Sequence, residues 1–144
     1  MKKLLSLRHV LTPHPGEMAR LTGKSIEDVL RDPAGFAENT AKAFGCIALL
    51  KGAVSVAAHP DGRLRYNASG NPGLAKGGSG DVLTGIITAL LAQGLEPFDA
   101  ASAGAYILGS SAESALELLH ERALTAGDVL DAIEKTAGIT EHRN

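Results

Sequence analysis

The 144-residue sequence contains one cysteine, no tryptophan and only 3% aromatic residues. A single thiol, Cys46, excludes an intramolecular disulfide and any metal site built from several cysteines, and it suits a reducing compartment. An excess of charge of one sign is also missing, because 14 Lys and Arg face 16 Asp and Glu, a formal net charge of −2. The sequence therefore has no bulk positive field, and we expect neither nucleic acid nor a membrane surface as a partner.

Long apolar runs are absent as well. The longest apolar-rich stretch, residues 82–92, is interrupted by Thr84, Gly85 and Thr88 and is too short to cross a bilayer. The apolar run near the amino terminus is broken at Ser6, too early for the core of a signal peptide. We therefore expect a cytoplasmic protein.

What the sequence does have is 44% hydrophobic residues and 17 glycines, a composition that predicts one globular domain over residues 1–144. Apolar periodicity and turn residues divide this domain into alternating strands and helices. Strands are expected over 9–12, 46–50, 54–58 and 64–66, and helices over 17–21, after Ser25, over 33–43, 81–93 and 97–119, and from 125 or 127 onward. Because Pro60-Asp61-Gly62 forms a turn, the last two strands should make a hairpin at an antiparallel edge. This pattern predicts an α/β layered fold.

A glycine-rich loop, Lys76-Gly77-Gly78-Ser79-Gly80-Asp81, directly precedes a predicted helix. Its backbone N–H groups are unshielded by side chains and lie at the positive end of the helix dipole, which favours a phosphate group. A carboxylate repels resting phosphate, so Asp81 suits an acid–base role on a hydroxyl that approaches it. Alternatively, the glycines form a turn, and Asp81 or Ser79 caps the helix.

A second candidate segment, Thr12-Pro13-His14-Pro15-Gly16-Glu17, follows the first predicted strand. The carboxyl ends of strands carry ligand sites in α/β sheets, so His14 and Glu17 are candidate ligand contacts. Glu17 is a candidate for holding Mg²⁺ through water. The alternative makes Glu17 a favourable first-turn charge and His14 a loop residue. The other histidines lack metal spacing and are expected to be solvated: His9, His59, His120 and His142.

A third candidate segment, Lys51-Gly52-Ala53-Val54-Ser55, follows the apolar strand that contains Cys46. Lys51 is a point charge for a nucleotide phosphate, and Ser55 offers a hydroxyl. The alternative is a solvated lysine at a strand end. Cys46 is predicted to be an inert thiol in the core.

Taken together, these segments resemble the ADP/ATP-dependent NAD(P)H-hydrate dehydratase family. The most specific block is Gly70-Asn71-Pro72-Gly73-Leu74-Ala75-Lys76-Gly77-Gly78-Ser79-Gly80-Asp81-Val82-Leu83-Thr84-Gly85, and the similarity continues through 91–101. The resemblance implies a ribokinase-like layered sheet with helices on both faces. It also implies a carbon–oxygen lyase that removes water from NAD(P)H hydrate at the expense of ADP or ATP. Full members are longer, so the chain corresponds to their C-terminal portion, without the N-terminal strands of the full fold.

The resemblance assigns roles to individual residues. It implies that Asp81 is catalytic and contacts the hydrate together with His14, while Mg²⁺ and the glycine amides stabilise the charge of phosphoryl transfer. The residues implied to bind nucleotide are Lys51, Gly52, Ala53, Val54, Ser55, Asn71, Gly77, Gly78, Ser79 and Gly80. Val54 departs from the family, which often has glycine there, whereas Ser55 keeps a hydroxyl.

Two other functions remain open from the sequence. One is a small-molecule alcohol kinase of the ribokinase-like superfamily, which would use a similar glycine loop and aspartate. The other is a noncatalytic nucleotide-binding half-domain that needs a partner chain. Because strands of the full fold are expected to be absent, we also predict a homo-oligomer or a partner that supplies the missing N-terminal half.

Overall fold

A computed structural model describes residues 5–117, 120 and 123–136, and it confirms the alternation of strands and helices. The elements, in chain order, are β1 (Val10–Leu11), α1 (Pro15–Thr22), α2 (Ile26–Arg31), α3 (Pro33–Phe44), β2 (Ile47–Leu50), β3 (Ser55–Ala58), β4 (Leu64–Asn67), the short 3₁₀ helix η1 (Pro72–Ala75), α4 (Ser79–Ala92), α5 (Pro97–Ala115) and α6 (Ala126–Thr136). Most ends lie within two or three residues of those expected. The α5 helix ends at Ala115, four residues before the expected end, and the tail from 138 lies outside the described residues.

The four strands form one sheet in the order β1-β2-β3-β4. The β1 and β2 strands run parallel, with Val10 opposite Ile47, and the helices α1 to α3 make the connection between them. The β3 and β4 strands form the predicted antiparallel hairpin, in which Val56 lies opposite Tyr66. The mixed sheet therefore has a parallel side and an antiparallel edge, as the sequence predicts.

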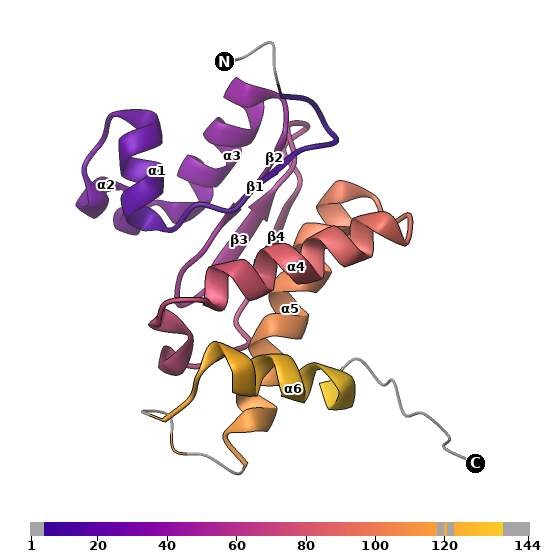
Figure 1. Cartoon of the computed structure of the whole chain (residues 1–144). Helices are drawn as coiled ribbons and strands as arrows, with labels where there is room; N and C mark the ends of the chain where they lie inside the picture. Colours follow the sequence, from indigo (N-terminus) through magenta and orange to yellow (C-terminus); the bar gives the residue numbers. More distant parts are fainter. Residues whose placement is uncertain (1–4, 118–119, 121–122, 137–144) are drawn as a thin grey trace.

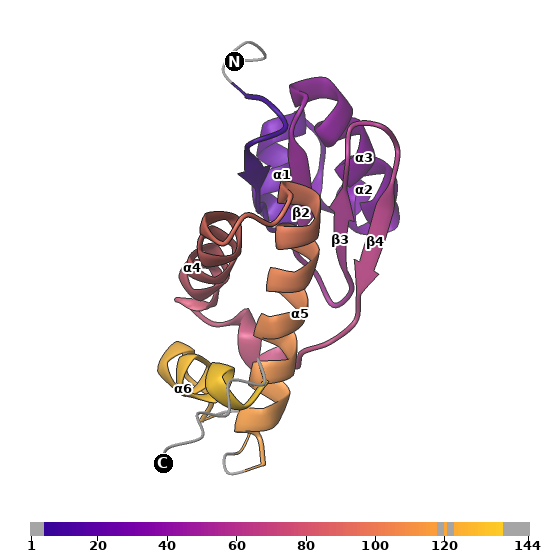
Figure 2. The same ribbon diagram turned by 90° about the vertical axis from the view of Figure 1, so that its right-hand side faces the viewer.

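Helices cover both faces of this sheet (Figure 1). On one face α1 to α3 enclose a core that includes Met18, Val29, Leu50 and Val56. On the other face the long α5 helix crosses the strands, as Figure 2 shows, and buries its small residues against side chains such as Leu49. The α4 helix packs mainly against α5 and also against α6. The predicted layered architecture is confirmed.

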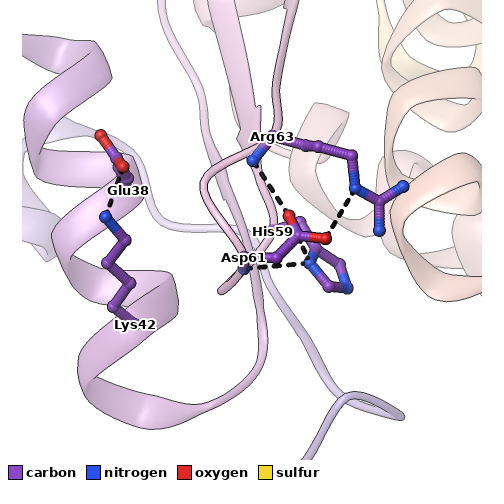
Figure 3. Close-up of polar contacts among 5 residues, drawn as sticks. All are labelled: Glu38, Lys42, His59, Asp61 and Arg63. Atoms are coloured by element: carbon purple, nitrogen blue, oxygen red, sulfur yellow. Dashed lines mark hydrogen bonds and ion pairs between the residues drawn. The ribbon is translucent and has the colours of Figure 1, made fainter.

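Charged side chains fold back onto the tip of the β3–β4 hairpin (Figure 3). The Asp61 carboxylate accepts hydrogen bonds from the backbone and the Nε of Arg63, at 3.0 and 2.8 Å, which lowers the pKa of this carboxyl group. His59 lies 2.8 Å from the same carboxylate and packs edge-on against Phe98, so its side chain is only 16% exposed. The expectation of a solvated His59 was therefore wrong, because the hairpin lies against the start of α5.

Two helices, α1 and α3, end at glycines in the left-handed conformation. Gly23 (φ 69°) follows α1, and Gly45 (φ 65°) follows α3 as predicted. Cys46 comes next and is completely buried, and burial raises the pKa of its thiol, in agreement with an inert core residue. Among the described residues, no helix is both long and apolar enough to cross a membrane.

Candidate functional site

The parallel pairing of β1 and β2 brings two of the predicted segments together. Beyond the two paired strands, the backbone N–H of Lys51 donates to the carbonyl of Pro13 at 2.9 Å. His14 begins α1 directly after this contact, and the turn of residues 51–54 leads into β3. Both segments therefore lie at the same end of the sheet, where the carboxyl ends of parallel strands meet.

His14 caps the first turn of α1. Its Nδ1 accepts hydrogen bonds from the backbone N–H groups of Gly16 and Glu17, at 3.0 and 3.3 Å. The capping is reciprocal, because the Glu17 Oε2 accepts a hydrogen bond from the His14 backbone N–H at 2.8 Å. The carboxylate accepts this hydrogen bond in its ionised form, which lowers the pKa of Glu17, and Lys51 and Arg20 lower it further against the effect of burial. With Nδ1 occupied as an acceptor, the neutral imidazole carries its proton on Nε2.

The first turn of α4 is built in the opposite way. Its N-cap is Gly78, in the left-handed conformation (φ 94°), and within the described part of the chain no side chain caps this helix. The alternative in which Ser79 or Asp81 caps α4 is therefore not what the structure shows. The backbone N–H groups of Asp81 and Val82 both donate to the Gly78 carbonyl, at 3.0 and 3.1 Å. Those of Ser79 and Gly80 have no such partner among the described residues and are open to a ligand.

Lys51 lies against this open helix start. A Cβ atom built on Gly80 would be 3.4 Å from the Lys51 Nζ, so the ammonium group sits over the first turn of α4. An ammonium group and the free N–H groups at the positive end of a helix attract the same ligand, an anion. The absence of a side chain at Gly80 leaves space for that anion beside Lys51.

These features border one cavity of about 710 Å³. The predicted site residues that line it are His14, Lys51, Gly52, Ala53, Ser55, Asn71, Ser79 and Gly80. Those that do not line it are Glu17, Val54, Gly77, Gly78 and Asp81. A second, shallower hollow of about 610 Å³ between α1 and α2 includes none of the predicted residues. The structure thus gathers three separated sequence segments around one cavity.

Asp81 does not line this cavity; it follows the lining residue Gly80 in the first turn of α4. Its side chain is exposed, and it makes no hydrogen bond or ion pair with another described residue. Val54, the departure from the family pattern, is 45% exposed and does not line the cavity. Its carbonyl oxygen lies close to Gly52, where it would be 3.2 Å from an added Cβ.

Sequence reasoning missed the part of the cavity wall that comes from α5. Ala105, Leu108 and Gly109 line the cavity, together with Asn67 at the end of β4 and Ser69 just after it. The signal that could have revealed this wall is the pair of small residues Ala105 and Gly109, four positions apart on one face of a helix. That pattern predicts close packing, although it does not say against which segment.

A divalent cation has few candidate ligands here. Among the described residues, no group of three or more His, Cys, Asp or Glu side chains could hold a metal ion. Glu17 is ionised and its side chain is 46% exposed, so its carboxylate keeps free lone pairs although it also caps α1. This donor set suits Mg²⁺ bound mainly to phosphate and water, and it does not suit a cage made of protein ligands alone.

Comparisons with known proteins place this chain in a family. Residues 2–135 match the family model described as NAD(P)H-hydrate dehydratase. The chain is 50% identical over 122 residues to the bifunctional NAD(P)H-hydrate repair enzyme Nnr of Moorella thermoacetica, covering 85% of this chain and 23% of that protein. It is 44% identical over 124 residues to the ADP-dependent (S)-NAD(P)H-hydrate dehydratase of Neisseria meningitidis, covering 85% of this chain and 42% of that protein.

Solved structures agree on the fold. The ADP/ATP-dependent NAD(P)H-hydrate dehydratase of Bacillus subtilis, co-crystallised with ATP and Mg²⁺, superposes with a TM-score of 0.86 at 35% identity, covering 90% of this chain and 48% of that one. A ribokinase-like superfamily protein of Enterococcus faecalis gives 0.74 at 28% identity, covering 92% of this chain and 45% of that one. The fold and site define a ribokinase-like protein. The chain belongs to the NAD(P)H-hydrate dehydratase family, and it spans less than half the length of these relatives.

Proposed function

We propose that this chain carries the nucleotide-binding and catalytic part of a dehydratase that restores NAD(P)H from its hydrates, NADHX and NADPHX, using ADP or ATP. The observation that carries the proposal is the uncapped start of α4, which has Lys51 over it and Asp81 in its first turn. This reaction is that of a carbon–oxygen lyase, and we place it in the cytoplasm. The names of the relatives support the substrate and the nucleotide.

The free N–H groups of Ser79 and Gly80 would hold the terminal phosphates of the nucleotide, with Lys51 neutralising part of their charge. These donors are fixed before the ligand arrives, because α4 holds the backbone and Gly78 supplies the left-handed turn. Gly52, Ala53, Ser55 and Asn71, which line the cavity, would lie around the same nucleotide, and Val54 would contribute only through the path of the turn. Gly77 and Gly78 would contribute through the path of the loop.

Asp81 would remove the proton from the hydroxyl group of the hydrate, so that the oxygen attacks the terminal phosphoryl group of ADP or ATP. The phosphorus–oxygen bond to the nucleotide breaks, and AMP or ADP leaves. In the second half of the reaction the carbon–oxygen bond breaks, phosphate departs, and loss of the neighbouring ring proton restores the double bond. The oxygen leaves as phosphate because phosphate is a far better leaving group than hydroxide.

His14 would contact the hydrate through its Nε2, which lies 3.5 Å from the Glu17 Oε1, while its Nδ1 caps α1. A bound Mg²⁺ would supply charge neutralisation on the phosphates. Glu17, ionised and next to Lys51, would hold that ion through water. Both residues then act from the start of α1, across the cavity from α4.

The test is clearance of NADHX with ADP and Mg²⁺, followed by detection of NADH, AMP and phosphate. Asp81→Asn should reduce turnover by about 100-fold or more, because it removes a general base. Asp131→Asn, on an exposed position of α6, is the matched control and should leave turnover unchanged. A stable phosphorylated alcohol as the product would instead support the kinase function.

We also propose that a second polypeptide completes the hydrate pocket, either another copy of this chain or a partner that supplies the missing N-terminal half. The support is that the chain covers 48% of the Bacillus subtilis structure, and that within the described residues the outer edge of β1 pairs with no strand. Turnover should appear, or increase, when the part of the Bacillus subtilis enzyme that this chain does not match is co-expressed with it. Equal turnover without that segment, from a chain that is monomeric by mass, would contradict this part of the proposal and the noncatalytic half-domain function together.

A further inference from the structure

Residues 67–71, which run from the end of β4 to the start of η1, are held against α5 by hydrogen bonds from their side chains. The Asn67 Nδ2 donates to the carbonyl of Ala105 at 3.1 Å, and the Ser69 Oγ donates to the carbonyl of Tyr106 at 3.3 Å. The Ser69 Oγ also lies 2.9 Å from the Asn67 Oδ1. These contacts join segments almost forty residues apart in sequence and hold the loop along the helix.

The last hydrogen bond between this loop and α5 is made by a carboxylate of α5, that of Glu113. The backbone N–H of Gly70 donates to the Glu113 Oε1 at 2.7 Å, the shortest of the hydrogen bonds between this loop and α5. Gly70 has a φ of 110°, and a Cβ on it would approach the Gly109 Cα at 3.3 Å, so the backbone passes close over the helix here. A hydrogen bond to an ionised acceptor is among the stronger ones in proteins.

Asn71 follows directly and reaches the nucleotide cavity. Its Oδ1 accepts from the backbone N–H of Gly73 at 2.9 Å and so caps η1. This cap fixes the side-chain amide, whose Nδ2 is buried and has no hydrogen-bond partner among the described residues. Because an unpaired buried donor is costly, the Asn71 Nδ2 is a donor that awaits a ligand at the cavity wall.

We propose that Glu113 is a positioning residue for the nucleotide site: it holds Gly70 and thereby sets the place of the Asn71 amide. The proposal rests on the proposed nucleotide-binding function. Glu113 does not line the cavity, so it acts through the loop and not on the ligand. An acidic side chain on the outer part of α5 thus controls a donor inside the site.

The test is ADP binding by calorimetry, with amide hydrogen exchange measured by NMR on the same samples. Glu113→Ala should weaken ADP binding by about tenfold, the value of one hydrogen bond to a charged group, and should speed exchange at the Gly70 N–H. Glu113→Gln keeps an acceptor and should recover most of the affinity. Glu117→Ala, which changes an exposed acidic residue just after α5, is the matched control and should change neither quantity.

A double variant separates positioning from general stability. If Glu113 acts through Asn71, then Asn71→Ala together with Glu113→Ala should bind ADP no more weakly than Asn71→Ala alone. Multiplied losses in the double variant, or unchanged affinity in Glu113→Ala, would overturn the proposal. If the parent chain binds no ADP, the proposed function fails. In that case, hydrogen exchange at the Gly70 N–H still tests whether Glu113 holds the loop. If Glu113→Ala leaves that exchange rate unchanged, Glu113 does not hold the loop.

Discussion

The α1 and α4 helices both begin at the cavity of about 710 Å³, yet they satisfy their first turns differently. In α1 the side chains of His14 and Glu17 occupy the free backbone groups, and the helix start is closed. In α4 the N-cap is a glycine, and within the described chain no side chain takes that place. The α5 helix also lacks a side-chain cap, but it begins with Pro97, which has no N–H to satisfy. The difference is that side chains satisfy the first turn of α1, whereas among the described residues the N–H groups of Ser79 and Gly80 in α4 remain open to a ligand.

Of the changes at these two helix starts, removing the ammonium charge over α4 should have the largest effect, a loss of ADP affinity. Lys51→Met deletes the ammonium group beside Gly80 while keeping the length of the side chain. We expect ADP affinity to fall by about 10- to 100-fold, as for loss of a charged hydrogen-bond partner. The measurement is calorimetry on Lys51→Met and on Lys24→Met, an exposed lysine after α1 that serves as the control. Equal losses in both variants would mean that only net charge matters.

Adding a methyl group at the start of α4 should change ADP affinity and the free energy of unfolding in opposite directions. Gly80→Ala places a Cβ at ordinary contact distance from the Lys51 Nζ, in the space expected for phosphate. We expect about a tenfold loss of ADP affinity, and a free energy of unfolding raised by up to about 1 kcal/mol, because alanine favours helix over glycine. Gly85→Ala, farther along α4 with open space around it, should give the gain in stability without the loss in affinity. Parallel losses of affinity and stability in Gly80→Ala would argue against an open helix start.

Removing the side-chain cap of α1 should lower the stability of the chain, the reverse of the gain expected for Gly80→Ala. His14→Ala removes the acceptor for the N–H groups of Gly16 and Glu17, and we expect the free energy of unfolding to fall by about 1 kcal/mol. His14→Asn keeps a capping side chain and should recover most of that loss, measured by urea denaturation. If the asparagine variant is as unstable as the alanine variant, the cap does not account for the role of His14 in stability.

The pH dependence of the α1 cap should be the smallest effect. The pKa of Glu17 is lower in the folded chain than in the unfolded chain, mainly because of the His14 backbone N–H. Its contribution to stability is therefore present in full above the unfolded pKa, about 4.3 for glutamate, and it is lost as the pH falls through the lower folded value. Glu17→Gln should show a shallower loss of stability with acid than the parent chain. Identical acid profiles would mean that the hydrogen bond does not favour the charged carboxylate.

Local signals in the sequence predicted much of this structure. Pro60-Asp61-Gly62 predicted the hairpin, Gly45 the end of α3, and the glycine run the start of α4, because each depends on residues within a few positions. The start of α1 was predicted two residues late. The helix begins at Pro15 and not at Glu17, with His14 as an unusual cap.

Contacts between distant segments could not be predicted in the same way. Parallel pairing of β1 and β2 explains why His14 and Lys51, each expected at a ligand site because it follows a strand, line the same cavity. The α5 side of the cavity depends on packing over almost forty residues, and no local pattern specifies it. The same reason explains His59, whose partner Phe98 belongs to another element.

The two cores of the sheet differ in how far apart along the chain their residues lie. The core under α1 to α3 is made of residues from Met18 to Leu64, whereas the opposite core reaches from Val10 to Ala132 and needs α5 and α6 in place. Contacts between near neighbours in sequence cost less loop-closure entropy and form sooner. The face that holds His14 and Lys51 can therefore assemble early in folding, and the cavity closes only when the later helices arrive.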